Sequence, residues 1–280
     1  GVALERREER VGGDAAFEVG SRDTNAAVGV YRLADGPQAL QLNLRRDDST
    51  QFGGRTTGAL AYGYGFAAGW RASASVGTAF KAPTFNDLYY PGFSNSELKP
   101  ETARNAEIAL RYASDDLAAG IVAYRNRVRD LIVFECDADF NCAPQNVAGA
   151  TLQGVTLDLR IRRGATIATA SVELQRPQDD ASGLLLPRRA RRHAALAVDH
   201  PFGPVQFRAE LSASSARFDD AANTRRMGGY ALLNLLIEWP FETRWTAFAR
   251  LDNVLDKRYE LAAGYRTAGV NLFAGVRWRY

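Results

Sequence analysis

Apolar and polar residues alternate with a period of two along most of the chain, while helical periodicity is almost absent. In the segment 205–214, every second residue is apolar: Val205, Phe207, Ala209, Leu211 and Ala213. Successive side chains of a strand point to opposite faces, so this pattern predicts a strand with one apolar and one polar face. The segment 269–280 alternates in the same way and ends on Trp278 and Tyr280.

The same pattern predicts about fourteen strands along the chain. They are expected at 1–10, 25–34, 38–47, 56–66, 69–79, 101–113, 116–133, 150–163, 165–176, 188–200, 204–216, 226–239, 243–254 and 268–280. Turn-forming residues separate these runs and set their boundaries.

The connections between the expected strands alternate between short and long. Short turns fall at 34–37, 66–69, 113–116, 163–164, 201–204 and 240–243. Longer polar loops fall at about 11–24, 48–55, 80–100, 134–149, 177–187, 217–225 and 255–267. Transmembrane barrels place tight turns at one end and long loops at the other, whereas a soluble sandwich has no reason to do so. The sequence therefore predicts an all-β, antiparallel transmembrane β-barrel.

Large aromatic residues gather beside the short turns. The set at that end comprises Trp70, Trp239, Trp245, Trp278 and Tyr280. Amphipathic rings prefer the headgroup level of a bilayer, so we interpret these residues as the periplasmic aromatic girdle of the barrel. The alternative is that large aromatics cap the end of a soluble barrel.

The composition narrows the functional classes. With 280 residues, 46% hydrophobic content and a mean hydropathy of −0.27, the chain contains no apolar run of the roughly 18 residues that a membrane-spanning helix needs. The net charge of +3 is small and the arginines are dispersed, which argues against nucleic acid as a partner. Only two histidines are present, and no Walker loop, catalytic triad or metal-binding histidine pair is recognisable. We therefore expect no enzymatic activity.

Four local motifs resemble signatures of the TonB-dependent outer-membrane receptors. They are SVGTAFKAPTF at 75–85, NSELKPE at 95–101, GVT at 154–156 and LDNVLDKRYE at 251–260. The resemblance extends over 1–280 and implies the C-terminal part of a barrel of about 22 strands. The plug domain and TonB box of such a receptor would then precede Gly1, which is not a Met, so we expect a piece of a longer precursor. The implied location is the outer membrane of a Gram-negative bacterium.

Within that family, several stretches resemble the cobalamin-transporting receptors: 46–53, 124–132, 186–190, 227–229 and 264–269. The resemblance implies TonB-energised uptake of a scarce large nutrient, cobalamin. It also implies the TonB complex (through an N-terminal region), outer-membrane lipid and lipopolysaccharide, and the barrel-assembly machinery as partners. Three alternatives stay open: a siderophore receptor of the same family, a soluble β-sandwich or binding barrel, and a complete barrel closed by pairing 1–10 with 268–280.

Four residues are candidate ligand contacts by resemblance. Arg188 aligns with an arginine that contacts cobalamin, and Tyr265 matches a loop aromatic that packs on the corrin ring. Phe93 or Tyr90 is a further aromatic candidate. The competing interpretation of the region after Arg188 is a basic ladder lining the lumen, with Arg189, Arg191 and His193 on one face by alternation. For Tyr265 the competing interpretation is packing within its own loop.

The two cysteines lie in one predicted long loop. Cys136 and Cys142 are close enough in sequence for a local disulfide in an exported protein. Free thiols or a soft-metal site are the alternative. Asp137, Asp139 and Asn141 imitate the start of a calcium loop, but its glycine and distal glutamate are absent. We assign no metal ligand and expect no covalent cofactor here; calcium is expected only in the full-length protein.

Overall fold

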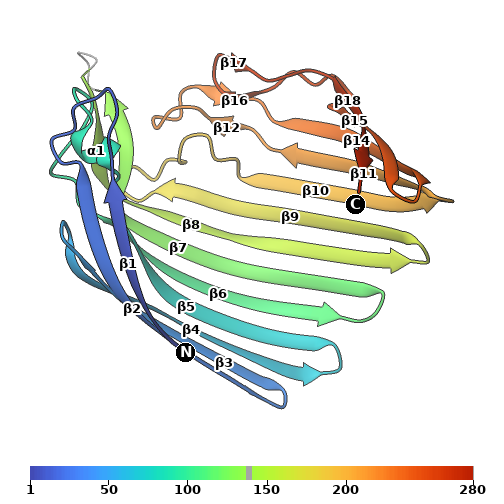
Figure 1. Cartoon of the computed structure of the whole chain (residues 1–280), viewed down its shortest axis with the longest axis horizontal. Helices are drawn as coiled ribbons and strands as arrows, with labels where there is room; N and C mark the ends of the chain where they lie inside the picture. Colours follow the sequence, from blue (N-terminus) through green and yellow to red (C-terminus); the bar gives the residue numbers. More distant parts are fainter. Residues whose placement is uncertain (137–140, 280) are drawn as a thin grey trace.

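The computed structural model describes residues 1–136 and 141–279. A single fourteen-stranded sheet dominates it, and its strands follow one another in the order β1-β2-β3-β4-β5-β6-β7-β8-β9-β10-β11-β14-β15-β18 (Figure 1). Their bounds are β1 Val2–Arg10, β2 Ser21–Asp35, β3 Gln38–Ser49, β4 Gly53–Ala67, β5 Trp70–Lys81, β6 Glu101–Ala113, β7 Leu117–Cys136, β8 Cys142–Arg163, β9 Thr166–Asp179, β10 Arg192–Phe202, β11 Val205–Ser214, β14 Tyr230–Glu242, β15 Trp245–Asp252 and β18 Asn271–Trp278. All fourteen predicted strands are confirmed.

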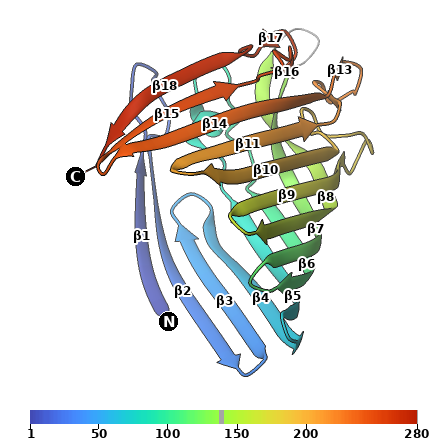
Figure 2. The ribbon, with the colours of Figure 1, turned by 90° about the vertical axis from the view of Figure 1, so that its right-hand side faces the viewer.

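Every neighbouring pair in the sheet is antiparallel, and the sheet curves into an open trough (Figures 1 and 2). Within the described residues, β1 pairs only with β2 and β18 pairs only with β15. The alternative of a complete barrel closed between the first and last strands is therefore wrong for this chain.

Short elements occupy the long connections. They are the helix α1 (Phe85–Tyr89), a hairpin of β12 (Arg217–Phe218) and β13 (Arg226–Met227), and a hairpin of β16 (Glu260–Ala262) and β17 (Tyr265–Arg266). Thr84 begins α1 with a capping box, in which its hydroxyl accepts from the Asp87 N–H and the Asp87 carboxylate accepts from the Thr84 N–H. No helix in the described part of the chain has the length and apolar character needed to cross a bilayer.

The sheet has an apolar face and a polar face, which we define by their side chains. The apolar face carries exposed large residues on nearly every strand, among them Leu4, Leu33, Leu44, Leu60, Val76, Ile108, Ile121, Leu157, Leu174, Leu196, Ile237 and Leu272. The buried apolar side chains lie instead toward the long-loop end, as Leu88, Leu98, Leu186 and Met227 show. This distribution is the reverse of a soluble sandwich, whose strands bury their apolar face, and it fits a belt that faces lipid.

The aromatic residues beside the short turns form contacts across neighbouring strands. Trp70 lies 5.0 Å from Tyr112 between ring centroids, and Trp245 lies 6.2 Å from Trp278, its register partner. The four tryptophans thus belong to the short-turn end of the sheet, where the sequence places the girdle. The last predicted member, Tyr280, lies outside the described residues.

Two predicted long loops are shorter than expected. β3 continues to Ser49 and β4 begins at Gly53, so the predicted loop 48–55 shrinks to a turn. β7 likewise continues to Cys136 and β8 begins at Cys142, within the predicted loop 134–149. Beyond the bilayer both faces of a strand meet water, so the one-sided polarity that reveals a strand disappears there while the backbone pairing continues.

The predicted start of a strand at Arg188 is also wrong, because β10 begins at Arg192. Arg188 has a φ of 58°, a left-handed conformation that interrupts a strand. Ala190 is buried, and its carbonyl accepts from the side chain of Gln175. The alternation that put Arg189 and Arg191 on one face with His193 therefore does not hold, and only His193 lies in the strand.

Candidate functional site

The long connections gather at one end of the sheet because antiparallel strands return alternate connections to the same end. This long-loop end comprises 11–20, 82–100, 180–191, 215–229 and 253–270. All four candidate ligand residues lie at this end of the sheet: Tyr90, Phe93 and Arg188 in its loops, and Tyr265 in β17. They do not all lie next to one another.

Arg188 connects three of these loops. Its Nε lies 2.7 Å from Oδ1 of Asp219, and its backbone N–H donates to the carbonyl of Phe218 at 2.6 Å. The same Asp219 oxygen accepts from the N–H of Ala263 at 3.2 Å. The Arg188 guanidinium holds the pKa of the Asp219 carboxyl below its ordinary value, chiefly through their hydrogen bond. Arg188 thus joins its own loop to the β12–β13 and β16–β17 hairpins.

The β12–β13 loop is closed by side chains that bond to the backbone. The Asn223 amide donates to the Leu185 carbonyl at 2.8 Å, and its oxygen accepts from the Leu185 N–H at 2.9 Å. Asp220 accepts from the N–H groups of Thr224 and Arg225 at 3.0 and 2.7 Å. These backbone donors lower the pKa of the Asp220 carboxyl to about 2. The loop is consequently held in shape by bonds that favour the ionised carboxylate.

Tyr265 projects from a loop whose base is fixed. Arg217 is buried, donates to the Glu260 carbonyl at 2.6 Å and lies over the Tyr230 ring at 5.4 Å. Asn253 accepts from the Lys257 N–H at 2.9 Å and donates to the Lys257 carbonyl at 3.0 Å, which closes the turn after β15. Tyr265 itself is 76% exposed. An exposed ring on an ordered hairpin is available to an apolar ligand surface, and packing of Tyr265 within its loop is not observed.

Tyr90 and Phe93 belong to a second group, beside α1. The Phe93 N–H donates to the Tyr90 carbonyl at 3.3 Å, and the Tyr90 ring meets the edge of Phe17 at 6.0 Å. Both side chains are exposed, whereas Leu88 in the adjoining helix is buried. Figure 1 shows α1 and the β16–β17 hairpin on opposite sides of the trough. The structure therefore brings Arg188 and Tyr265 into neighbouring loops and places Tyr90 and Phe93 across from them.

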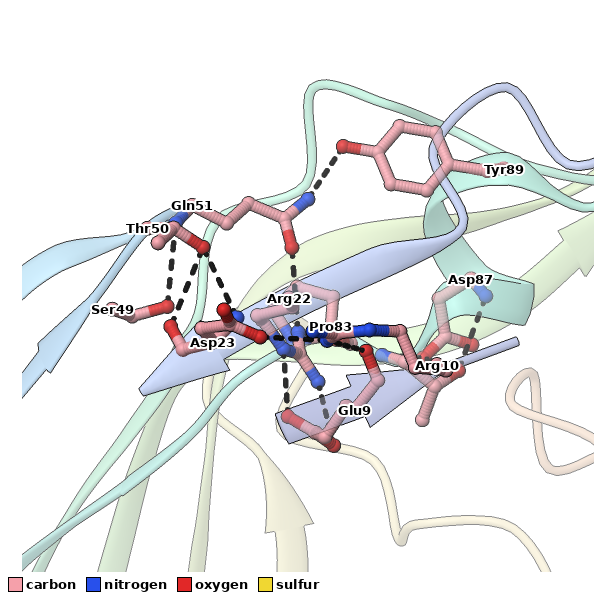
Figure 3. Close-up of polar contacts among 11 residues, drawn as sticks. Glu9, Arg10, Arg22, Asp23, Ser49, Thr50, Gln51, Pro83, Asp87 and Tyr89 are labelled. Atoms are coloured by element: carbon pink, nitrogen blue, oxygen red, sulfur yellow. Dashed lines mark hydrogen bonds and ion pairs between the residues drawn. The ribbon is translucent and has the colours of Figure 1, made fainter. Parts of the chain in front are cut away.

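Arg22 anchors the loop that carries Tyr90 and Phe93 (Figure 3). It is 7% exposed, and its guanidinium forms two hydrogen bonds to Glu9, at 2.9 and 3.2 Å. A third bond reaches the Pro83 carbonyl at 2.9 Å. The guanidinium also lies over the rings of Phe52 and Phe85, at 5.6 and 5.1 Å. Sequence reasoning missed this residue because its hydrogen-bond partners are up to 61 positions away.

The β7–β8 hairpin supports the same loop from its other side. Asn146 donates to the carbonyls of Lys99 and Asp130 at 2.9 and 2.7 Å, and it accepts from the Lys99 N–H at 2.7 Å. Asn95 donates to the Pro144 carbonyl at 3.2 Å. Asn95 opens the NSELKPE motif that the sequence singled out, but the sequence gave no signal for Asn146 or for the contacts of either residue, because their partners include backbone groups of segments distant in the chain. The loop 82–100 is thus clamped between β1–β2 and β7–β8.

The predicted cysteine pair is described only in part. Cys142 is disulfide-bonded, and no free cysteine occurs among the described residues. The backbones of Cys136 and Cys142 are register partners across β7 and β8. The side chain of Cys136, together with Asp137 and Asp139 of the calcium-like motif, lies outside the described part of the chain. No cluster of metal-ligating side chains is found among the residues that are described.

The polar face carries a chain of ion pairs and a cavity. Arg208 lies 3.2 Å from Asp199 and 2.6 Å from Glu210, and Arg250 lies 3.4 Å from Glu210 and 2.7 Å from Asp252. A cavity of about 670 Å³ lies beside these ion pairs, and Arg208 and Glu210 are among its lining residues. Its polar lining includes Asp158, Arg160, Ser171, Arg208, Glu210 and Asn234. This face can receive a charged protein surface inside the trough.

Comparison with known protein families shows one match that covers most of the chain. Residues 10–254 match the family described as "TonB dependent receptor-like, beta-barrel". The vitamin B12 transporter BtuB of Vibrio vulnificus (strain YJ016) is 30% identical over 100% of this chain and 47% of its own length. The vitamin B12 transporter BtuB of Photobacterium profundum is 28% identical over 92% of this chain and 43% of its own length. The chain thus spans about half the length of the curated relatives it matches.

Solved structures of low identity share the fold. The copper transporter OprC superposes with a TM-score of 0.79 at 18% identity, over 92% of this chain and 49% of its own. The siderophore receptor PirA from Acinetobacter baumannii superposes with a TM-score of 0.81 at 16% identity, over 99% of this chain and 51% of its own. At such identities the likeness concerns the fold of the curved sheet alone.

Proposed function

Because the chain belongs to the TonB-dependent receptor β-barrel family, we propose that it forms part of the wall and the ligand-gathering loops of an outer-membrane uptake receptor. The barrels of this family lie in the outer membrane of Gram-negative bacteria, which gives the apolar face its lipid contact. The family consists of receptors and transporters rather than enzymes.

The ligand we propose is cobalamin, and the exposed Tyr265 beside the Arg188–Asp219 pair carries the proposal. A ring that is 76% exposed on a hairpin fixed at its base suits one face of a large amphipathic ligand. The guanidinium of Arg188, which is connected to that hairpin through Asp219, offers hydrogen-bond donors at the same group of loops. Tyr90 and Phe93 would contact the ligand from across the opening. The similarity to vitamin B12 transporters over the whole chain supports this choice of ligand.

The energy for uptake would come from TonB, as the name of the family indicates. The trough would enclose a plug whose charged side chains meet the polar face. The cavity beside Arg208 and Glu210 is the part of that face best shaped to receive them. In this arrangement the chain supplies the passage and the loop contacts, and the moving part would be the plug.

A siderophore is the second candidate ligand, because exposed arginines surround the same loops. Arg189, Arg191, Arg225, Arg226 and Arg258 are all exposed at the long-loop end. Anionic ferric siderophores would be attracted by this charge, whereas cobalamin binding would depend mainly on the aromatic contacts. The two candidates therefore differ in their sensitivity to salt and to loss of the ring.

The test is cobalamin binding by the complete gene product that contains this chain, purified from outer membranes. Tyr265→Ala removes the ring, and we expect the Kd to rise about 30-fold, since an anchoring aromatic contributes about 2 kcal/mol. Tyr31→Ala is the matched control, because Tyr31 is an exposed tyrosine on β2 outside the loops. Unchanged affinity in a Tyr265→Ala, Arg188→Ala double variant would refute the site. Binding of a ferric siderophore but not of cobalamin would favour the second candidate.

A further inference from the structure

We propose that Phe134 of β7 is a further contact for the transported ligand, and that it receives an aromatic group of that ligand beside Tyr90 and Phe93. The inference rests on the proposed function and adds a residue on a strand to the candidates in the loops. It also names the substrate class, which is a large ligand that carries an aromatic group on its main body. The height of Phe134, its face of the hairpin and the fixed backbone around it point to this role.

Phe134 lies too far from the membrane to contact lipid. Along β7, Phe134 is fifteen residues from Ala119, which pairs with Tyr112 at the aromatic girdle. At ~3.4 Å per residue this separation is about 51 Å, and a strand tilt of about 40° reduces it to roughly 39 Å of height. The apolar band of a barrel is only about 25 Å tall. The Phe134 side chain, which is 61% exposed, therefore faces water or a ligand.

Phe134 occupies the face of the β7–β8 hairpin on which the loop 82–100 lies. Register partners share one face of a sheet, and the partner of Phe134 is the buried Pro144. Asn146 lies two residues along β8 and so shares that face, and its side chain binds the backbone of the loop 82–100. The Pro144 carbonyl accepts from the side chain of Asn95 in the same loop, at 3.2 Å. The Phe134 ring therefore stands on the side of the loop that carries Tyr90 and Phe93.

A buried carboxylate fixes the backbone that leads to Phe134. Asp130 has a φ of 54°, which interrupts the regular strand conformation four residues earlier. Glu101 is 9% exposed, accepts from the Ile132 N–H at 2.8 Å and forms an ion pair with Lys81 at 3.1 Å. Lys81 ends β5 and Glu101 begins β6, so this carboxylate joins both ends of the loop between them to the strand of Phe134. The ring is thus presented by an ordered backbone rather than by a free loop.

Exposed aromatic rings gather on this side of the opening. Phe93 lies two residues before Asn95, which binds the strand opposite Phe134. The Tyr90 ring meets the edge of Phe17, from the loop between β1 and β2, at 6.0 Å. Tyr90 and Phe93 are 42% and 52% exposed, so all three candidate rings leave surface free for a ligand. Aromatic rings favour edge and offset contacts with one another, which suits such a group to an aromatic part of the ligand.

The two sides of the opening differ in chemistry. On the side of the β16–β17 hairpin, the Arg188–Asp219 ion pair places charge near Tyr265. On the side of α1, shown opposite in Figure 1, the candidate contacts are aromatic rings. Cobalamin has two matching parts, a corrin ring that bears amide groups and an aromatic base carried on one of its side chains. In the arrangement we infer, the corrin ring lies on Tyr265 and the base reaches Phe134.

The probes are cobalamin and cobinamide, which keeps the corrin ring but lacks the aromatic base. The measurement is the Kd of each for the complete gene product, purified from outer membranes. We expect Phe134→Ala to raise the Kd of cobalamin about tenfold and that of cobinamide less than about twofold, because only cobalamin loses a ring contact. Phe134→Tyr keeps the ring and should bind both probes as the wild type does. An unchanged Kd of cobalamin in Phe134→Ala, or an equal rise for both probes, would overturn the proposal.

Phe202→Ala is the matched control, because Phe202 is 63% exposed but ends β10 at the short-turn end of the sheet. It should leave both Kd values unchanged, and a rise in the Kd of cobalamin equal to that of Phe134→Ala would overturn the assignment to a local contact. Tyr265→Ala should weaken both probes, since both contain the corrin ring. Failure of the wild type to bind cobalamin at all would refute the proposed function itself, so the two failures are distinguishable.

Amide exchange separates a ligand contact from mere support of the loop. The Lys99 N–H donates to the side chain of Asn146 at 2.7 Å, so its exchange rate reports whether the hairpin still holds the loop. In Phe134→Ala without ligand, the Lys99 amide should exchange at the wild-type rate. Exchange more than about threefold faster would make Phe134 a support of the loop and overturn its assignment as a ligand contact.

Discussion

Arg22→Ala removes the buried cation that fixes the loop 82–100 to the first two strands. The guanidinium forms two bonds to Glu9 and one to the Pro83 carbonyl, and it lies over Phe52 and Phe85. Removing one partner of a buried ion pair lowers the stability of the folded state by about 3–5 kcal/mol. Because the Glu9 carboxylate is partly exposed and solvent screens it, we take this loss as about 2 kcal/mol. The lost bond to Pro83 adds roughly 1 kcal/mol.

The free energy of opening this loop should therefore fall by about 3 kcal/mol, which corresponds to about a hundredfold in the opening equilibrium. Hydrogen exchange measures it directly, because the N–H of Tyr90 donates to the Asn86 carbonyl and the N–H of Asn95 donates to the Asp87 carbonyl. Both amides should exchange about a hundredfold faster in the variant. Amides of β3 and β4 should keep their wild-type rates.

Arg55→Ala is the matched control for this experiment. Arg55 belongs to the same end of the sheet and lies over the Phe80 ring at 5.7 Å, but it is exposed. Its loss should change exchange at Tyr90 and Asn95 by less than about threefold. The reasoning is refuted if Arg22→Ala changes these two amides no more than Arg55→Ala does, or if exchange accelerates uniformly over the whole sheet.

Two further predictions concern the loops and the turns. The pKa of Asp220 is about 2 in the folded loop, against an ordinary value of 3.8. The ionised carboxylate therefore stabilises the folded loop fully above about pH 4, and this stabilisation is lost as the pH falls through 2. Cleavage by pepsin at Phe218, measured relative to cleavage of an unfolded substrate, should therefore increase in the wild type as the pH is lowered from about 3.5 to 2. In Asp220→Asn the relative cleavage should be high at both pH values. Gly69→Ala should destabilise the barrel by over about 1 kcal/mol in urea titration, since φ is +76° and the new Cβ would lie 2.5 Å from the Ala113 carbonyl oxygen. Gly36→Ala, with φ +52° and nothing within 4 Å, should cost less; equal costs would contradict the steric argument.

The sequence was sufficient for the strands because their signal is local. A strand that faces lipid on one side and a polar interior on the other must alternate, and it does so in segments such as 205–214 wherever it crosses the membrane. The same alternation gave wrong strand boundaries at two places: it predicted a long loop at 48–55 and a strand at 188–191. In the first the strands continue into water, where both faces are polar; in the second a left-handed Arg188 interrupts a run that looks continuous in sequence.

The sequence by itself determined where the strands lie along the chain, the asymmetry of the two ends and the position of the tryptophans, because each depends on residues that are neighbours in the chain. Only the tertiary structure decided that the sheet stays open and that Arg188 and Tyr265 share a linked set of loops while Tyr90 and Phe93 lie across from them. These facts depend on register and on contacts between residues tens of positions apart. No local pattern records such contacts, because each partner alone is an ordinary polar residue.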